Sequence, residues 1–174
     1  MPPFAFALAR QVALLLPPDI HPMVVHFPIV LLYITAGVEI TAMVIRDSER
    51  FWQRVAFLGL TAACFFTVIT MALGFVSEQS VHFPPAAAVI LGQHQHFAVL
   101  TGLTEGAAWI LQLFSRFRRS KGWSVLGTGR GRTTWLSAAL VVLAAVFVTL
   151  TARLGGKMVY DYGAGVLGVT RITP

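Results

Sequence analysis

The sequence is poor in charged residues, which make up 11% of its 174 residues, whereas hydrophobic residues make up 56%. A soluble domain usually carries about 25% charged residues. The mean hydropathy of the chain is correspondingly high, at +0.75. The composition therefore excludes an ordinary soluble fold and predicts an integral membrane protein whose length suits one domain.

Cysteine is nearly absent, and so are the patterns of common hydrolases. Cys64 stands alone inside an apolar run, which excludes an internal disulfide and a Cys-x-x-Cys-His site for covalent haem attachment. No Gly-x-Ser-x-Gly sequence occurs, and Ser77 and Ser80 have no convincing acid–base partners. These absences favour a protein without substrate chemistry of its own.

Four apolar stretches are long enough to cross a membrane, which takes roughly 20 residues of helix. The third is short, but it can extend backwards through the uncharged sequence LGQHQH. We therefore predict an all-α, four-helix membrane bundle with an interfacial segment at 1–20, a transmembrane domain at 21–153 and a tail at 154–174. The predicted spans are residues 23–45, 55–76, 97–114 and 134–152.

The basic residues lie in two of the three predicted connections. The connection between the third and fourth spans holds six and no acid, the first connection holds three, and residues 77–93 hold none. By the positive-inside rule the basic connections are cytoplasmic, which places both termini and residues 77–93 on the outer, periplasmic side of a bacterial inner membrane. Topology thus accounts for most of the net charge of +6, without nucleic-acid binding. The residues concerned are Arg46, Arg50, Arg54, Arg116, Arg118, Arg119, Lys121, Arg130 and Arg132.

All five histidines fall on the predicted outer side. His21 and His26 flank the start of the first span, His82 lies in the connection at 77–93, and His94 and His96 open the third span. Histidines that merely fill core positions are not expected to segregate in this way. The pattern indicates a binding site near the outer surface.

Two prolines shape the start of the first span. Pro22 suits the first helical position, which leaves His21 at the cap. Pro28 lies deeper and cannot donate a hydrogen bond to the Val24 carbonyl, so we expect a kink beside His26. Helical periodicity places Tyr33 and Gly37 on the face of His26, and we interpret that face as the one that shapes a site.

Periodicity separates the two histidines of the third span. At about 100° per residue, His94 and His96 point in nearly opposite directions. His94 heads a polar stripe, whereas His96 shares a face with leucine and phenylalanine. Polar residues of spanning helices normally face the bundle interior, so we predict that His94 points inward and keep His96 as the alternative. The other members of the stripe are Ala98, Thr101, Glu105 and Gln112.

Two acids lie inside the predicted spans, where a charge costs roughly 2.5–3.5 kcal/mol. Glu39 lies near the inner surface, and we expect an interfacial ion pair with Arg46. Glu105 lies near mid-membrane, where we expect it to be protonated or bonded to a neighbouring helix. A proton-relay role for Glu105 is the alternative.

Four motifs give the chain a resemblance to a known family. They are IHPMVVHFPIVLL at 20–32, LGFVSE at the end of the second span, the histidine that opens the third, and LGGKMVYDYGAGV at 154–166. Together they resemble bacterial membrane proteins of the domain of unknown function family 2231. The family pattern maps onto His21, Pro22, His26, Pro28, Gly155, Gly156, Tyr160, Gly163 and Gly165. Some relatives are joined to iron–sulfur or cytochrome domains, which implies a redox setting.

The leading hypothesis is a b-type haem protein for electron transfer. Two histidines on facing helices of a bundle can hold haem iron from both sides. The expected ligands are His26 with His94 or His96. Tyr33 and Gly37 would form a flat wall for the macrocycle, and Arg153 and Lys157 would pair with the propionates.

Two other hypotheses stay open. In the first, the bundle is an accessory subunit of a larger respiratory or photosynthetic complex, and its histidines only cap helices and form hydrogen bonds. In the second, the protein handles zinc or copper, which imidazole binds well. In the leading hypothesis, by contrast, the haem protein would exchange electrons with a larger respiratory or photosynthetic complex or with a periplasmic carrier. The metal ligands would be His21, His26, His82, His94 and His96.

Overall fold

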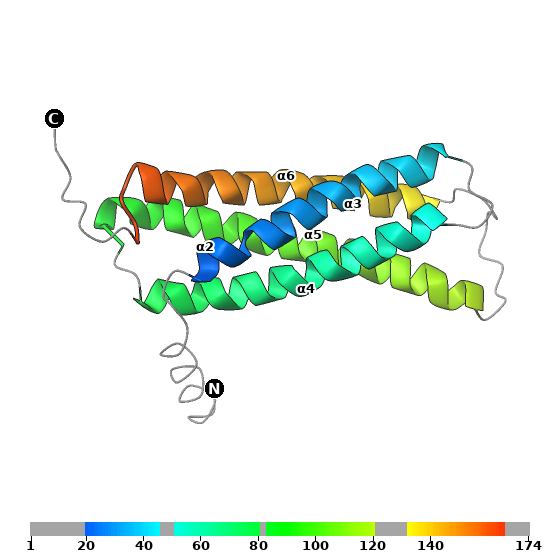
Figure 1. The fold of residues 1–174 in the computed structure, drawn as a ribbon, viewed down its shortest axis with the longest axis horizontal. Helices are drawn as coiled ribbons and strands as arrows, with labels where there is room; N and C mark the ends of the chain where they lie inside the picture. The colour runs from blue at the N-terminus through cyan, green and yellow to red at the C-terminus, as the bar shows by residue number, and fades with distance from the viewer. Residues whose placement is uncertain (1–19, 46–50, 81–82, 121–131, 166–174) are drawn as a thin grey trace, which may run out of the picture.

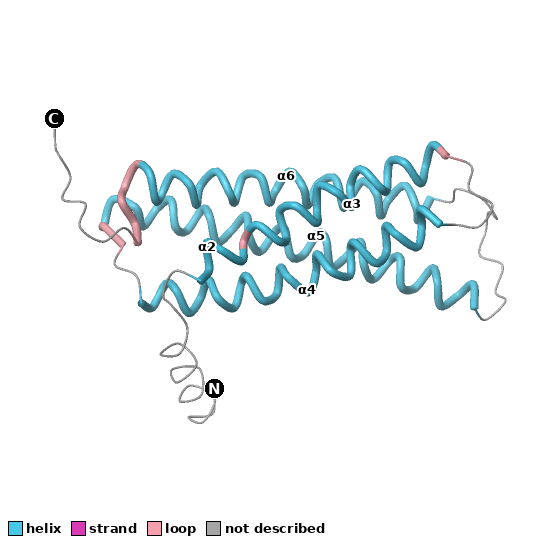
Figure 2. Tube along the Cα trace, viewed as in Figure 1, coloured by secondary structure: helices cyan, strands magenta, loops and turns pink. Residues whose placement is uncertain are grey.

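The computed structural model describes residues 20–45, 51–80, 83–120 and 132–165. These residues form helices and short turns, without a strand (Figure 2). The helices are α2 (Ile20–Val24), α3 (His26–Val44), α4 (Phe51–Ser80), the 3-10 helix η1 (Pro85–Ala87), α5 (Ala88–Ser120) and α6 (Arg132–Tyr160). Four stretches are long and apolar enough to cross a membrane: Ile20–Val44, Phe51–Gln79, Pro85–Phe117 and Trp135–Tyr160. The predicted all-α fold with four spans is thus confirmed.

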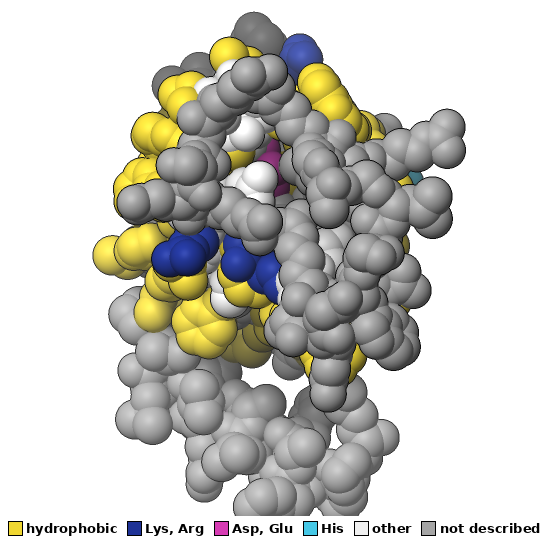
Figure 3. Space-filling view, turned by 90° about the vertical axis from the view of Figure 1, so that its right-hand side faces the viewer, with side chains coloured by type: hydrophobic (Ala, Val, Ile, Leu, Met, Phe, Trp, Pro, Cys, Tyr) yellow, Lys and Arg dark blue, Asp and Glu magenta, His cyan; other side chains and the backbone are white. Residues whose placement is uncertain are grey.

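The four long helices run side by side as a bundle (Figure 1). α5 packs along α6 and α3 along α4, and the contacts of α3 with α6 and of α4 with α5 close the ring. We call the end where α2 begins and α6 finishes the histidine end, and the other the basic end. Figure 3 looks onto the basic end, where Lys and Arg side chains are visible.

The outward faces of the helices are apolar, as expected for contact with lipid. Phe65, Val68, Leu103 and Ile110 each expose more than half of their surface. Inside the bundle, small residues bring the helices together: Ala63 and Ala144 pack against Leu32. This arrangement gives each spanning helix a lipid face and an interior face.

The helices are longer than the predicted spans. α5 begins at Ala88, so LGQHQH is helical, as its lack of charge suggested. α6 continues past residue 153 to Tyr160, so the predicted boundary of the tail falls inside a helix. The chain then turns at Gly163, whose φ of 64° suits a residue without a Cβ. This turn packs Ala164 against Ile90 and Met158 and gives the YDYGAG motif a structural role. The predicted segment 1–20 lies almost entirely outside the described residues.

The expected kink in the first span is present. A turn at Val25 separates α2 from α3, and Pro28 follows three residues later, on the buried face of α3. Around the break, the backbone N–H of Val25 still donates to the carbonyl of His21, at 3.1 Å. The kink therefore changes the direction of the helix without unwinding it, and α2 packs mainly against α4.

Candidate functional site: two histidines on glycines

His21 of α2 packs against α4 at the histidine end of the bundle. Its Nδ1 is 3.1 Å from the carbonyl oxygen of Thr70. A Cβ built on Gly74 would lie 3.0 Å from Cε1 of the ring, so the imidazole rests on the bare backbone of that glycine. Thr70 and Gly74 are one helical turn apart, which means that one turn of α4 both orients and supports the ring.

His94 repeats this arrangement between α5 and α6. Its Nδ1 is 2.9 Å from the carbonyl oxygen of Thr151, and a Cβ on Gly155 would lie 3.4 Å from its Cε1. A carbonyl oxygen only accepts, so Nδ1 carries the proton in both rings. In the neutral ring, Nε2 is then the atom with the lone pair, the state in which histidine binds a metal ion.

The two rings lie close enough for their charges to interact. Both are half-buried at the histidine end of the bundle. His21 comes from the first of the four family motifs, Gly74 from the second, His94 from the third and Gly155 from the fourth. Motifs spread over about 135 residues of sequence thus meet in one place.

The structure places His26, the ligand expected on the first span, on an exposed face of α3. Its side chain is exposed, and Tyr33 and Gly37 on the same face are exposed as well. The hydroxyl of Tyr33 contacts Thr149 Oγ1 at 2.5 Å, outside the bundle interior. The shared face was predicted correctly, but it points outward, because the buried face of α3 carries Pro28, Leu32, Thr35, Glu39 and Ala42. The inward histidine of the first span is therefore His21.

The direction predicted for the third span is confirmed. His94 is half-buried against α6, and the polar stripe below it is inside the bundle, with Thr101 at 3% exposure and Glu105 at 1%. His96 is exposed on the opposite side of α5. Its ring meets Phe97 edge-on, with the centroids 5.9 Å apart.

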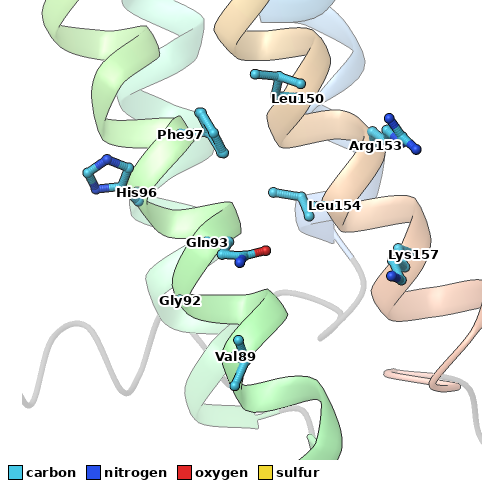
Figure 4. Close-up of a pocket in the computed structure, with 9 residues that line it drawn as sticks. All are labelled: Val89, Gly92, Gln93, His96, Phe97, Leu150, Arg153, Leu154 and Lys157. Atoms are coloured by element: carbon cyan, nitrogen blue, oxygen red, sulfur yellow. The ribbon is translucent and has the colours of Figure 1, made fainter.

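His96 instead borders a groove of about 710 Å³ between α5 and α6 (Figure 4). Phe97, Leu150 and Leu154 form its apolar part, and Arg153 and Lys157 contribute charge from α6. Both basic side chains are exposed, and they line this groove rather than the contact between His94 and Gly155. The propionate role expected for them stays a prediction without a contact to support it.

The acid of the first span is buried at the basic end. Glu39 is 3% exposed and accepts a hydrogen bond from the side-chain amide of Gln112, which also donates to Ser137 at 2.9 Å. Arg116 lies close enough to interact electrostatically with Glu39. The expected partner, Arg46, lies outside the described residues. Glu39 is thus held inside the bundle by an amide, and its expected ion pair with Arg46 stays a prediction.

In the described part of the chain, no three His, Cys, Asp or Glu side chains gather as a metal-binding group. His21 and His94 form a pair, whereas His26 and His96 point elsewhere. His82 lies outside the described residues. The hypothesis of a site made by all five histidines therefore gains no support from the described geometry.

Comparison with known proteins agrees with the resemblance drawn from the motifs. A family model described as predicted membrane protein (DUF2231) matches residues 17–168, so the chain belongs to this family. No curated protein and no solved structure matches the chain.

Proposed function

We propose that this member of the DUF2231 family is a b-type haem protein that transfers electrons in the membrane, and that His21 and His94 would hold the iron. The observation that carries the proposal is the matched setting of the two rings. Each rests on a glycine of another helix and is fixed by a backbone carbonyl through Nδ1. Such a bond sets the tautomer and orientation of a metal-binding imidazole.

The surrounding residues fit a cofactor of this kind. The glycine under each ring lets the imidazole lie directly on the neighbouring helix, and bundle cores commonly hold cofactors between side chains of facing helices. Haem would supply one-electron redox chemistry. The residues of the chain would hold the ring nitrogens in place.

The orientation of the bundle belongs to the same proposal. We place the basic end in the cytoplasm, because its connections carry the lysines and arginines. The histidine end then faces the periplasm of a bacterial inner membrane. A haem there would exchange electrons with a periplasmic carrier or with a larger membrane complex.

The test is the absorption spectrum of protein purified from haem-replete cells, recorded oxidised and then reduced with dithionite. We expect sharp b-type bands after reduction. Acid–acetone should extract the haem, because one cysteine cannot form a covalent haem attachment. Well-folded protein without haem would refute the proposal and would favour the accessory subunit, in which the same histidines only fasten α2 to α4 and α5 to α6.

A further inference from the structure

Among the described residues, Glu105 is the most deeply buried ionisable side chain that the proposed haem site does not use. It is 1% exposed, and its Oε2 has no hydrogen-bond partner among the described residues. A buried polar atom without a partner is rare in proteins and calls for an explanation. An intramembrane acid in this state is a candidate for proton transfer.

Most threonines of the spans satisfy their hydroxyls within their own helix. Thr61, Thr101 and Thr151, for example, donate to the carbonyl four residues earlier, at 2.7–2.9 Å. Thr67 and Thr70 of α4 differ, because their hydroxyl oxygens are buried and have no partner among the described residues. These two hydroxyls are free to bind water or a proton-carrying group.

The two hydroxyls lie in a row between Glu105 and the histidine end. Thr67 interacts with the Glu105 carboxyl, although not at hydrogen-bonding geometry. Thr70 is three residues further along α4, about 4.5 Å of helix rise, and its carbonyl oxygen bonds to His21. One water molecule between neighbouring hydroxyls would complete the row, since a hydroxyl both donates and accepts.

Toward the basic end, the neighbours of Glu105 are apolar. Ala108 is the next buried residue on that side of α5, and it packs with Leu60 and Val141 in an apolar layer. Beyond this layer, Glu39 and Gln112 are bonded to each other. The apolar layer separates Glu105 from Glu39. A proton on Glu105 is therefore expected to exchange with the histidine end.

We infer that Glu105 is a proton-binding site that exchanges its proton with the histidine end of the bundle through Thr67 and Thr70. The carboxyl O–H bond breaks as the Thr67 oxygen accepts the proton, Thr67 passes its own hydroxyl proton through the bridging water to Thr70, and Thr70 passes its hydroxyl proton to water at the histidine end. The carboxylate that remains takes up a proton by the reverse path.

Few other titratable groups face Glu105. Cys64 of α4 interacts with it electrostatically. Toward the histidine end, the next ionisable groups are His21 on α2 and His94 on α5, and toward the basic end it is Glu39 on α3. On α6, the described side chains of Arg153 and Lys157 are exposed near the histidine end. A proton on this carboxyl is therefore separated from the charged surface by the residues of the row.

Infrared spectroscopy of the purified full-length protein tests the site itself. The spectrum should contain the C=O band of a buried carboxylic acid, which shifts when H₂O is replaced by D₂O. Glu105→Gln should remove a component of this band that Glu39→Gln leaves in place, and a component from the buried Glu39 can remain. A spectrum in which Glu105→Gln removes no component would overturn the inference. The measurement needs no haem, so its failure and the failure of the haem proposal are distinguishable.

The rate at which the C=O band shifts in D₂O tests the path through Thr67 and Thr70. Thr67→Val removes the hydroxyl at nearly constant shape and should slow the exchange by about tenfold or more. Thr67→Ser should restore the rate, and Thr101→Val, whose hydroxyl is already bonded to Phe97 O, should leave it unchanged. An unchanged rate in Thr67→Val would exclude the row as the path.

Discussion

Each of the two inward, half-buried histidines depends on a residue that has no side chain. Gly74 and Gly155 let the rings lie directly on the backbones of α4 and α6. The carbonyls of Thr70 and Thr151 then fix the rings through Nδ1. The sites are thus made by backbone atoms, which require glycine at one position but place no demand on the threonine side chains.

Gly74→Ala tests the importance of this contact. The new Cβ would lie 3.0 Å from Cε1 of His21, so the ring must move or α2 must shift. Overpacking of this kind costs about 1–3 kcal/mol, and we expect weaker haem retention with an altered low-spin spectrum. Gly37→Ala is the matched control, because a Cβ there meets nothing within 4 Å. Equal haem content and spectra in the two variants would show that His21 does not need the bare backbone.

At the residue scale, the sequence predicts the inward direction of His94 from the polar stripe that it heads. For the first span it offers both His21, at the helix cap, and His26, beside the proline kink, and it favours His26. A signal was present: Glu39 follows His21 by 18 residues, about five helical turns, as Gln112 follows His94. The two partners of the Glu39–Gln112 bond therefore mark the faces that carry the two inward histidines.

Among the elements, α3 and α4 lie in close contact at Gly59. A Cβ built there would lie 2.7 Å from Oγ1 of Thr35, which is itself 1% exposed. Close contact at small residues is the main source of helix association in membranes, where lipid is as apolar as the side chains. The crossing of α3 and α4 thus depends on this glycine.

Gly59→Ala should therefore loosen the bundle. We expect a loss of about 1–3 kcal/mol in stability, because the new methyl group must displace Thr35 or the helix. Thermal unfolding in a mild detergent, followed by circular dichroism, measures the effect against Gly106→Ala, where a Cβ meets nothing within 4 Å. A variant as stable as that control would mean that α3 and α4 tolerate a wider separation.

The sequence predicts the helices better than it predicts which residues of neighbouring helices contact each other. Runs of apolar residues and the scarcity of charge predict four spans, and periodicity predicts the buried face of α5. The pairing of Gly74 with His21 or Gly59 with Thr35 depends on how two helices cross, and neither helix carries that information alone. For the same reason, Glu39 could be placed near the basic end but not matched with Gln112.

Across the whole molecule, the polar residues form a column from one end of the bundle to the other. The histidine pair occupies one end, Glu105 the middle and the Glu39–Gln112 bond the other end. The basic connections follow that last group. The two ends of the bundle thus carry different polar groups, and any function must use this difference.

The orientation of the column can be measured directly. We expect the connection between α5 and α6 to be cytoplasmic, because residues 116–132 include six basic residues. Single cysteines introduced there in a Cys64→Ala background should react only with membrane-permeant reagents in intact cells, whereas a cysteine at position 79, at the other end, should also react with impermeant ones. The reverse pattern would turn the histidine end toward the cytoplasm.

The most direct test of the central claim compares four alanine variants by their reduced-minus-oxidised spectra. His21→Ala and His94→Ala should lose the low-spin b-type bands, because each removes one of the two inward imidazoles. His26→Ala and His96→Ala, matched controls on the same spans, should keep them, because both side chains are exposed. A spectrum lost in His26→Ala but retained in His21→Ala would contradict the assignment of the site.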